Sequence, residues 1–80
     1  MSPTVVYEGG YRIIIFPNDH PPAHVHVIKG DEDGRVRLEP VEFMEESDFT
    51  PRQVRAILNL VKEHQQELLE RWDEIHPEGR

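Results

Sequence analysis

The chain has 80 residues, no cysteine and a formal net charge of −7 at pH 7. This length allows a single domain over residues 1–80, which buries only about 60–65% of its unfolded surface. The missing cysteine excludes disulfides, thiolate metal ligands and thiol nucleophiles. The negative charge argues against broad binding to nucleic acid, so a DNA partner is not expected.

The sequence contains no signal for membrane insertion or export. No apolar run approaches the ~20 residues of a membrane span, and the N-terminus lacks a basic region followed by an apolar stretch. We therefore expect a cytoplasmic protein without membrane contact.

Strands are expected within residues 4–43. Residues 4–8 and 11–16 are rich in β-branched and aromatic side chains and flank Gly9-Gly10, a tight-hairpin signal. Residues 24–29 and 35–38 alternate apolar and polar side chains, and residues 30–34 are expected to form a polar turn. Beyond Pro40, residues 41–43 are expected as a short edge strand or an extended connection, and residues 45–48 as a solvated acidic linker.

The second half predicts a helix over about residues 51–75. Thr50 is a suitable N-cap, Pro51 suits the first helical position and Gln53 completes a capping box. Apolar residues recur at helical spacing from Val54 to Ile75. The expected fold class is therefore α+β: a small, mainly antiparallel sheet of three to four strands with one long C-terminal amphipathic helix packed on one face. An apolar outer sheet face would then favour a homodimer or a small protein partner.

Histidines are concentrated at the start of the third expected strand. His20, His24 and His26 fall within seven residues, next to Asp19 and two prolines. Because alternate strand residues share a face, His24 and His26 should point the same way, with Cβ atoms roughly 7 Å apart. His20, in the preceding turn, can fold back over them.

One interpretation of this cluster is a metal site. Asp19, His20, His24 and His26 offer carboxylate and imidazole ligands that suit zinc, iron, nickel or copper, with a position left open for chemistry. His64 is a further candidate ligand, whose proximity depends on which sheet face the helix covers.

Two other interpretations stay open. In the first, His24 and His26 act as general acid and base on RNA, while Arg12 or Arg37 holds the phosphate. In the second, the histidines and Asp19 shape a turn in a non-catalytic module for protein–protein interaction. Arg12 is equally compatible with a strand-end arginine that reaches solvent.

The segment 18–27, preceded by 11–16, resembles the N-D-H-x-P-x-H-x-H-V signature of the domain-of-unknown-function 4160 family of small, mostly bacterial proteins. The stretch from His64 to Trp72 is similar to the ending of that family. Asp19, His20, His24, His26 and His64 match its recurring polar residues, whereas Pro40 and the acidic segment 45–48 depart from its pattern. The resemblance implies a toxin-like component of a two-protein, toxin–antitoxin type system.

Overall fold

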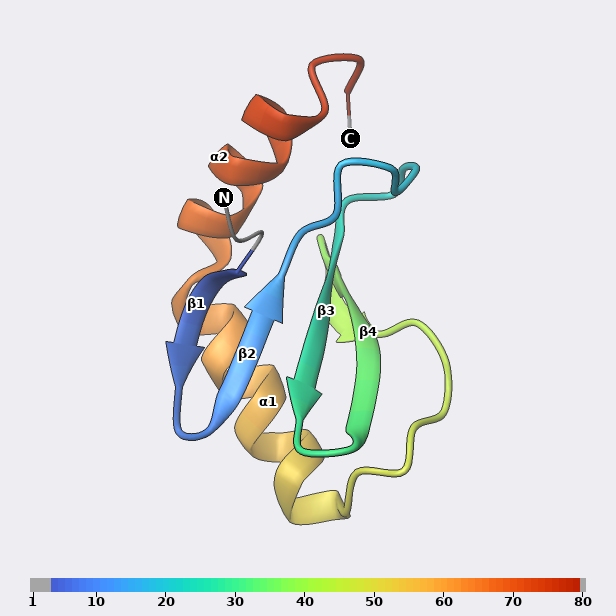
Figure 1. Ribbon diagram of the computed structural model, residues 1–80, viewed down its shortest axis with the longest axis vertical. Coiled ribbons are helices and arrows are strands. Elements are labelled where there is room, and N and C mark those ends of the chain that lie inside the picture. Colours follow the sequence, from blue (N-terminus) through green and yellow to red (C-terminus); the bar gives the residue numbers. More distant parts are fainter. Residues whose placement is uncertain (1–3, 80) are drawn as a thin grey trace.

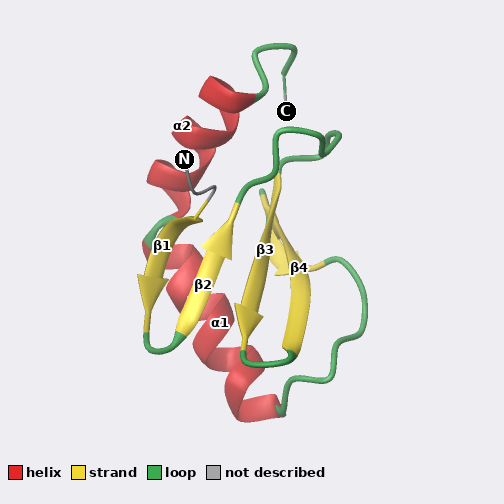
Figure 2. Cartoon of the chain, viewed as in Figure 1, coloured by secondary structure: helices red, strands yellow, loops and turns green. Residues whose placement is uncertain are grey.

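A computed structural model describes residues 4–79 of the chain. Within them, five strands precede two helices: β1 (Thr4–Glu8), β2 (Tyr11–Ile14), β3 (His24–Lys29), β4 (Glu32–Leu38), β5 (Val41–Phe43), α1 (Pro51–Glu63) and α2 (Gln65–Ile75). The strands form one sheet in the order β1-β2-β3-β4-β5, and each adjacent pair is antiparallel. Both helices lie on the same side of this sheet (Figure 1), so the protein has two layers, one of strands and one of helices (Figure 2).

The α+β class and the antiparallel sheet were predicted, but the sheet has more strands than the three to four expected. Residues 41–43 form β5, because a tight turn at Glu39-Pro40 brings Val41 opposite Leu38. β4 begins at Glu32 and not at residue 35, because the connection from β3 is a two-residue turn, Gly30-Asp31. Gly30 has φ +60°, which suits the first central position of such a turn.

The prediction of one long helix was wrong in one respect: the helical segment is divided at His64. This residue has φ −105° and ψ 11°, outside helical values. The division falls between Val61 and Leu68, where the apolar stripe has a gap. The start of α1 is as expected, since Thr50 Oγ1 accepts a bond from the Gln53 N–H (3.2 Å) and Gln53 Oε1 accepts one from the Thr50 N–H (2.9 Å).

The hydrophobic core lies between the sheet and the helices. Alternate strand residues face it, as the pleat requires, and the apolar stripes of α1 and α2 meet them. The largest fully buried side chains are Trp72, Ile13, Ile15, Leu38, Ile57, Leu68, His76, Val25, Val27, Val36 and Val61. Since Val25 and Val27 face the helices, the intervening His26 faces the opposite side of the sheet.

The outer sheet face differs from the apolar surface that we expected. Ile13, Ile14 and Ile15 are all buried, and Phe16 is half-buried. Among residues 4–79, Tyr7 is the exposed large hydrophobic residue. These side chains therefore do not form the exposed apolar face that we expected, and the homodimer or small protein partner stays a prediction. Neither helix in the described part of the chain combines the length and apolarity that crossing a bilayer requires.

Candidate metal centre

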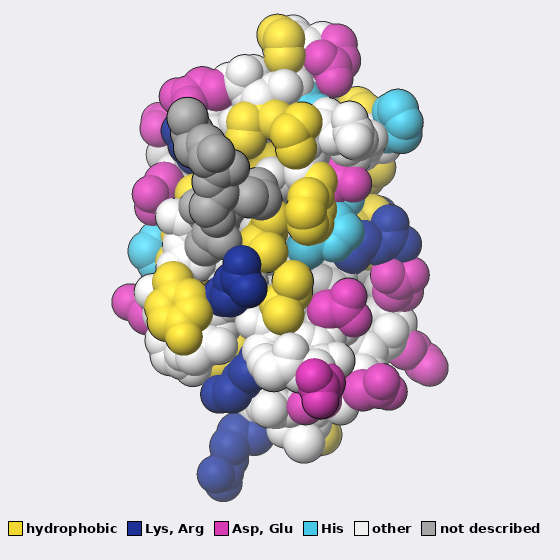
Figure 3. All heavy atoms as spheres, viewed as in Figure 1, with side chains coloured by type: hydrophobic (Ala, Val, Ile, Leu, Met, Phe, Trp, Pro, Cys, Tyr) yellow, Lys and Arg dark blue, Asp and Glu magenta, His cyan; other side chains and the backbone are white. Residues whose placement is uncertain are grey.

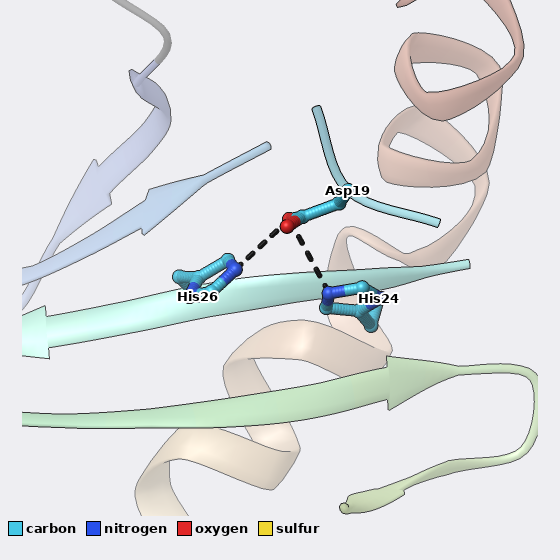
Figure 4. A group of neighbouring side chains, drawn as sticks. All are labelled: Asp19, His24 and His26. Carbon is cyan, nitrogen blue, oxygen red and sulfur yellow. Dashed lines mark hydrogen bonds and ion pairs between the residues drawn. The ribbon is translucent and has the colours of Figure 1, made fainter. Parts of the chain in front are cut away.

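Three side chains that the sequence singled out converge at the start of β3. The Nε2 atom of His26 lies 2.9 Å from Oδ2 of Asp19, and Nε2 of His24 lies 3.3 Å from the same oxygen. Asp19 comes from the turn between β2 and β3 and points down at the two imidazoles (Figure 4). One ligand atom from each residue lies within 4.8 Å of the other two, so a single ion can contact all three.

Local structure places Asp19 over the strand. Proline at position 17 cannot donate to the β-ladder, so the chain leaves the sheet after β2. The Asp19 N–H then donates to the Phe16 carbonyl at 3.2 Å, which closes a tight turn. The Phe16 ring packs edge-on against His26, with ring centroids 4.7 Å apart. The turn thus positions the carboxylate, and Phe16 limits the rotation of the His26 imidazole.

The hydrogen bonds of His24 determine its tautomer. Its Nδ1 lies 2.8 Å from the Pro22 carbonyl oxygen, which can only accept, so Nδ1 carries the proton. In the neutral ring, Nε2 then has a lone pair. That nitrogen is buried and has no hydrogen-bond partner, and its 3.3 Å approach to Asp19 is not a hydrogen bond. The lone pair of His24 Nε2 and the carboxylate oxygen of Asp19 can both coordinate a cation bound between them.

The histidine rings are held by aromatic neighbours. His24 is 4% exposed, and its ring lies 5.4 Å from that of Trp72 on α2. Trp72 is fixed in turn, because its Nε1–H donates to the Gly79 carbonyl at 3.1 Å and the ring of His76 stacks on it at 3.8 Å. The C-terminal helix therefore supports the buried imidazole from the core side.

The distances from the Asp19 oxygen to the two histidine nitrogens suit zinc. Tetrahedral zinc holds nitrogen and oxygen ligands at about 2.0–2.2 Å, which places neighbouring ligand atoms about 3.3 Å apart. The separations from Asp19 Oδ2, 3.3 Å to His24 and 2.9 Å to His26, are close to this value. The hydrogen bond from His24 Nδ1–H to the Pro22 carbonyl oxygen is of the kind through which proteins orient a metal-binding imidazole.

Of the other residues predicted for the site, His20 and Arg12 lie outside the group of three, whereas Arg37 is a cross-strand neighbour of His24. His20 is exposed on the turn and is not part of the group formed by Asp19, His24 and His26. Arg12 is exposed on β2, opposite Ile28. Arg37 lies opposite His24, and its Nη1 donates to Glu42 at 2.9 Å.

His64 belongs to a different group of side chains. Its Nδ1 lies 3.1 Å from Glu67 Oε1 and its Nε2 lies 3.5 Å from Glu8 Oε2, at the end of β1. The hydrogen bond with Glu67 raises the pKa of His64, burial opposes this rise, and Glu8 adds to it. The contacts of His64 thus connect the junction between α1 and α2 with β1, an edge strand of the sheet.

Two functional candidates were missed by the sequence analysis. Arg35 lies opposite His26 in the β3–β4 register, and its guanidinium binds Glu45. In the sequence, Arg35 was expected to begin the fourth strand after a turn over residues 30–34, and residues 45–48 were expected to form a solvated linker. The signal in the sequence is Gly30-Asp31: if these two residues are taken as a two-residue turn, the antiparallel register pairs Arg35 with His26. Figure 3 shows histidine, basic and acidic side chains next to one another on this face.

Comparisons with known proteins identify the family of this chain. No curated protein and no solved structure matches the chain. A family model, described as Domain of unknown function (DUF4160), matches residues 10–73, which include the whole Asp19, His24 and His26 group. The match covers most of the chain and agrees with the resemblance noted in the sequence. The chain belongs to the DUF4160 family.

Proposed function

We propose that this protein binds a divalent transition-metal ion such as zinc through Asp19, His24 and His26. We further propose that the bound ion acts on RNA phosphate in a toxin-like, cytoplasmic component of a two-protein system. The observation that carries the metal site is the buried, unpartnered Nε2 of His24, which faces a carboxylate oxygen. The toxin-like role is supported by the family resemblance.

Three protein ligands leave further coordination positions open. A metal with an open position can hold a water or a phosphate oxygen and stabilise the charge that develops on it. His26 is 21% exposed in its side chain and lines a groove on the outer sheet face, which connects the centre with solvent. This exposure is what a reactive centre needs, whereas a closed structural site would be covered.

Metal binding requires a change at His26. In the metal-free protein, the Nε2–H of His26 donates a hydrogen bond to Asp19 Oδ2 at 2.9 Å. To ligate through Nε2, the ring must move its proton to Nδ1. Histidine NMR distinguishes the two tautomers, so this shift gives a readout that is independent of activity.

The decisive experiment is a zinc titration of the metal-free protein followed by histidine ring NMR. We expect His24 and His26 signals to shift together, to saturate at one equivalent, and to show His26 in its Nδ1–H form. His26→Ala should abolish saturable binding. His20→Ala is the matched control, because His20 lies in the same turn but outside the group, and it should bind like the parent protein. Independent titration of His24 and His26 with unchanged tautomers would refute the metal site.

A growth assay tests the proposed cellular role. If the metal centre is responsible, expression of the chain should inhibit growth and His26→Ala should remove the inhibition, with His20→Ala retaining it. Equal inhibition by a folded His24→Ala, His26→Ala double variant would exclude the site as its cause.

A second candidate is favoured by the Asp19–His26 hydrogen bond. It ties the turn to β3, so the same residues suit a structural element of a non-catalytic interaction module. In this case His26→Ala lowers the free energy of unfolding, zinc does not bind at one equivalent, and a protein partner is retained by the folded parent chain.

A further inference from the structure

A groove of ≈ 540 Å³ lies beside the candidate metal centre on the outer sheet face. His26 and Arg35 line it from adjacent strands, and Glu45 lines it from the segment that follows β5. Its lining also includes three further carboxylates, from Asp33, Glu46 and Asp48. The groove therefore combines one guanidinium with an excess of negative charge.

Arg35 and Glu45 form a two-point ion pair within this groove. Arg35 Nε donates to Glu45 Oε1 at 2.8 Å, and Nη2 donates to Oε2 at 2.9 Å. These parallel bonds use the edge of the guanidinium with which arginine also binds two oxygens of a phosphate. The Glu45 carboxylate thus occupies the position next to Arg35 at which a phosphate group would bind.

This anion position is next to the three potential metal ligands. Arg35 and His26 are directly opposite in the antiparallel register, so their side chains leave the same face of the sheet. Both side chains also line the same groove. One phosphate can therefore approach both the guanidinium and a metal ion.

We propose that Arg35 binds the substrate phosphodiester at the metal centre and that Glu45 holds this position until the phosphodiester displaces it. This inference rests on the proposed function and names the residue that recognises the substrate. It replaces Arg12 and Arg37, which the sequence suggested for that role. Asp33, Glu46 and Asp48 add negative charge to the lining, so binding of the phosphodiester depends on the attraction of both Arg35 and the metal ion.

A neighbouring ion pair provides a matched control. Arg37 and Glu42 are also joined across the β4–β5 pair, with Nη1 to Oε1 at 2.9 Å, but neither residue lines the groove. Glu42→Gln and Glu45→Gln remove the same charge from the same kind of exposed contact. Only the second should affect binding in the groove.

The test is an NMR titration of zinc-loaded protein with thymidylyl-thymidine, a dinucleotide with one phosphodiester and no 2′-hydroxyl. We expect Glu45→Gln to bind it at least about threefold more tightly than the parent, as the loss of one competing exposed ion pair implies. Arg35→Gln should lose saturable binding, while its zinc affinity stays within about threefold of the parent. The uncharged methylphosphonate dinucleotide should not distinguish the variants.

The outcomes separate this inference from the proposed function. Zinc binding by the parent chain, combined with equal dinucleotide affinities for Arg35→Gln and the parent, would overturn the role of Arg35 and leave the metal site intact. A gain in Glu42→Gln equal to that in Glu45→Gln would also overturn it, because the effect would then be one of general charge. Failure of the parent chain to bind zinc would refute the proposed function itself.

Discussion

His24 Nε2 and Asp19 Oδ2 lie 3.3 Å apart without a hydrogen bond, although the nitrogen is buried. The neutral ring has one N–H, at Nδ1, which donates to the Pro22 carbonyl, so Nε2 and the Asp19 oxygen face each other as two electron-rich atoms. Such an arrangement is unfavourable without a proton or a metal ion between the two atoms. This relationship makes Asp19 the residue whose substitution best separates binding from stability.

We expect Asp19→Asn to lower zinc affinity at least about tenfold, because a carboxylate ligand becomes a neutral amide. The free energy of unfolding of the metal-free protein should change by less than about 1 kcal/mol, since the amide NH2 can donate to His24 Nε2 and, once the His26 proton has moved to Nδ1, to His26 Nε2 as well. Zinc competition titrations and urea unfolding measure the two quantities. A strongly destabilised variant with parental zinc affinity would mean that Asp19 is structural.

Trp72→Phe should loosen the C-terminal turn. Phenylalanine lacks the N–H that bonds to the Gly79 carbonyl and loses part of the surface against His24 and His76. We expect a loss of about 1–2 kcal/mol in the free energy of unfolding, with faster amide exchange at Gly79. Ile57→Val, a conservative core substitution in α1, is the control and should leave that exchange rate unchanged. Equal rates in the parent and Trp72→Phe would contradict the anchoring contact.

Gly34→Ala tests how closely the segment after β5 packs on β4. A Cβ at this position would lie 3.1 Å from Phe43 Cε1, so that ring must move slightly, and 3.4 Å from Phe49 Cε2, which is an ordinary contact distance. We expect about 1–3 kcal/mol of destabilisation and shifted ring signals for Phe43. Gly30→Ala is an informative comparison, because its added methyl meets open space and only the φ of +60° opposes it. It should cost about 1 kcal/mol without shifting the Phe43 ring signals.

His64 should make stability depend on pH. Its pKa is raised by Glu67 and, to a smaller extent, by Glu8, so the folded state binds the proton more tightly than the unfolded state. The contribution is therefore fully present below the unfolded pKa of about 6.5, and it is lost as pH rises through the raised folded value. For this partly exposed contact we expect about 0.5 kcal/mol.

Urea unfolding at pH 5.5 and 8.5 measures the effect of His64. Because other groups titrate over the same range, the quantity to compare is the difference between the parent protein and Glu67→Gln at each pH. That difference should be larger at pH 5.5. An equal difference at both pH values would show that the contact with Glu67 does not depend on the charge of His64.

Local sequence patterns were sufficient for much of the fold. The Gly9-Gly10 hairpin, the alternation of Val25 and Val27, and the Thr50 cap each depend on residues close together in the chain. The same short range explains why the sequence predicted that His24 and His26 share a face. Such features follow from backbone geometry and do not require knowledge of which distant segment packs nearby.

Features that depend on distant contacts were decided only by the tertiary structure. Sequence spacing placed Asp19 near the two histidines, but the fold excluded His20, buried His24 against Trp72, and paired Arg35 with both His26 and Glu45. The division of the helix at His64 is likewise accompanied by a contact with Glu8, more than fifty residues away in the chain. The physical reason is common to these cases: each side chain's position is set by partners from other elements, whose register and packing a local pattern does not contain.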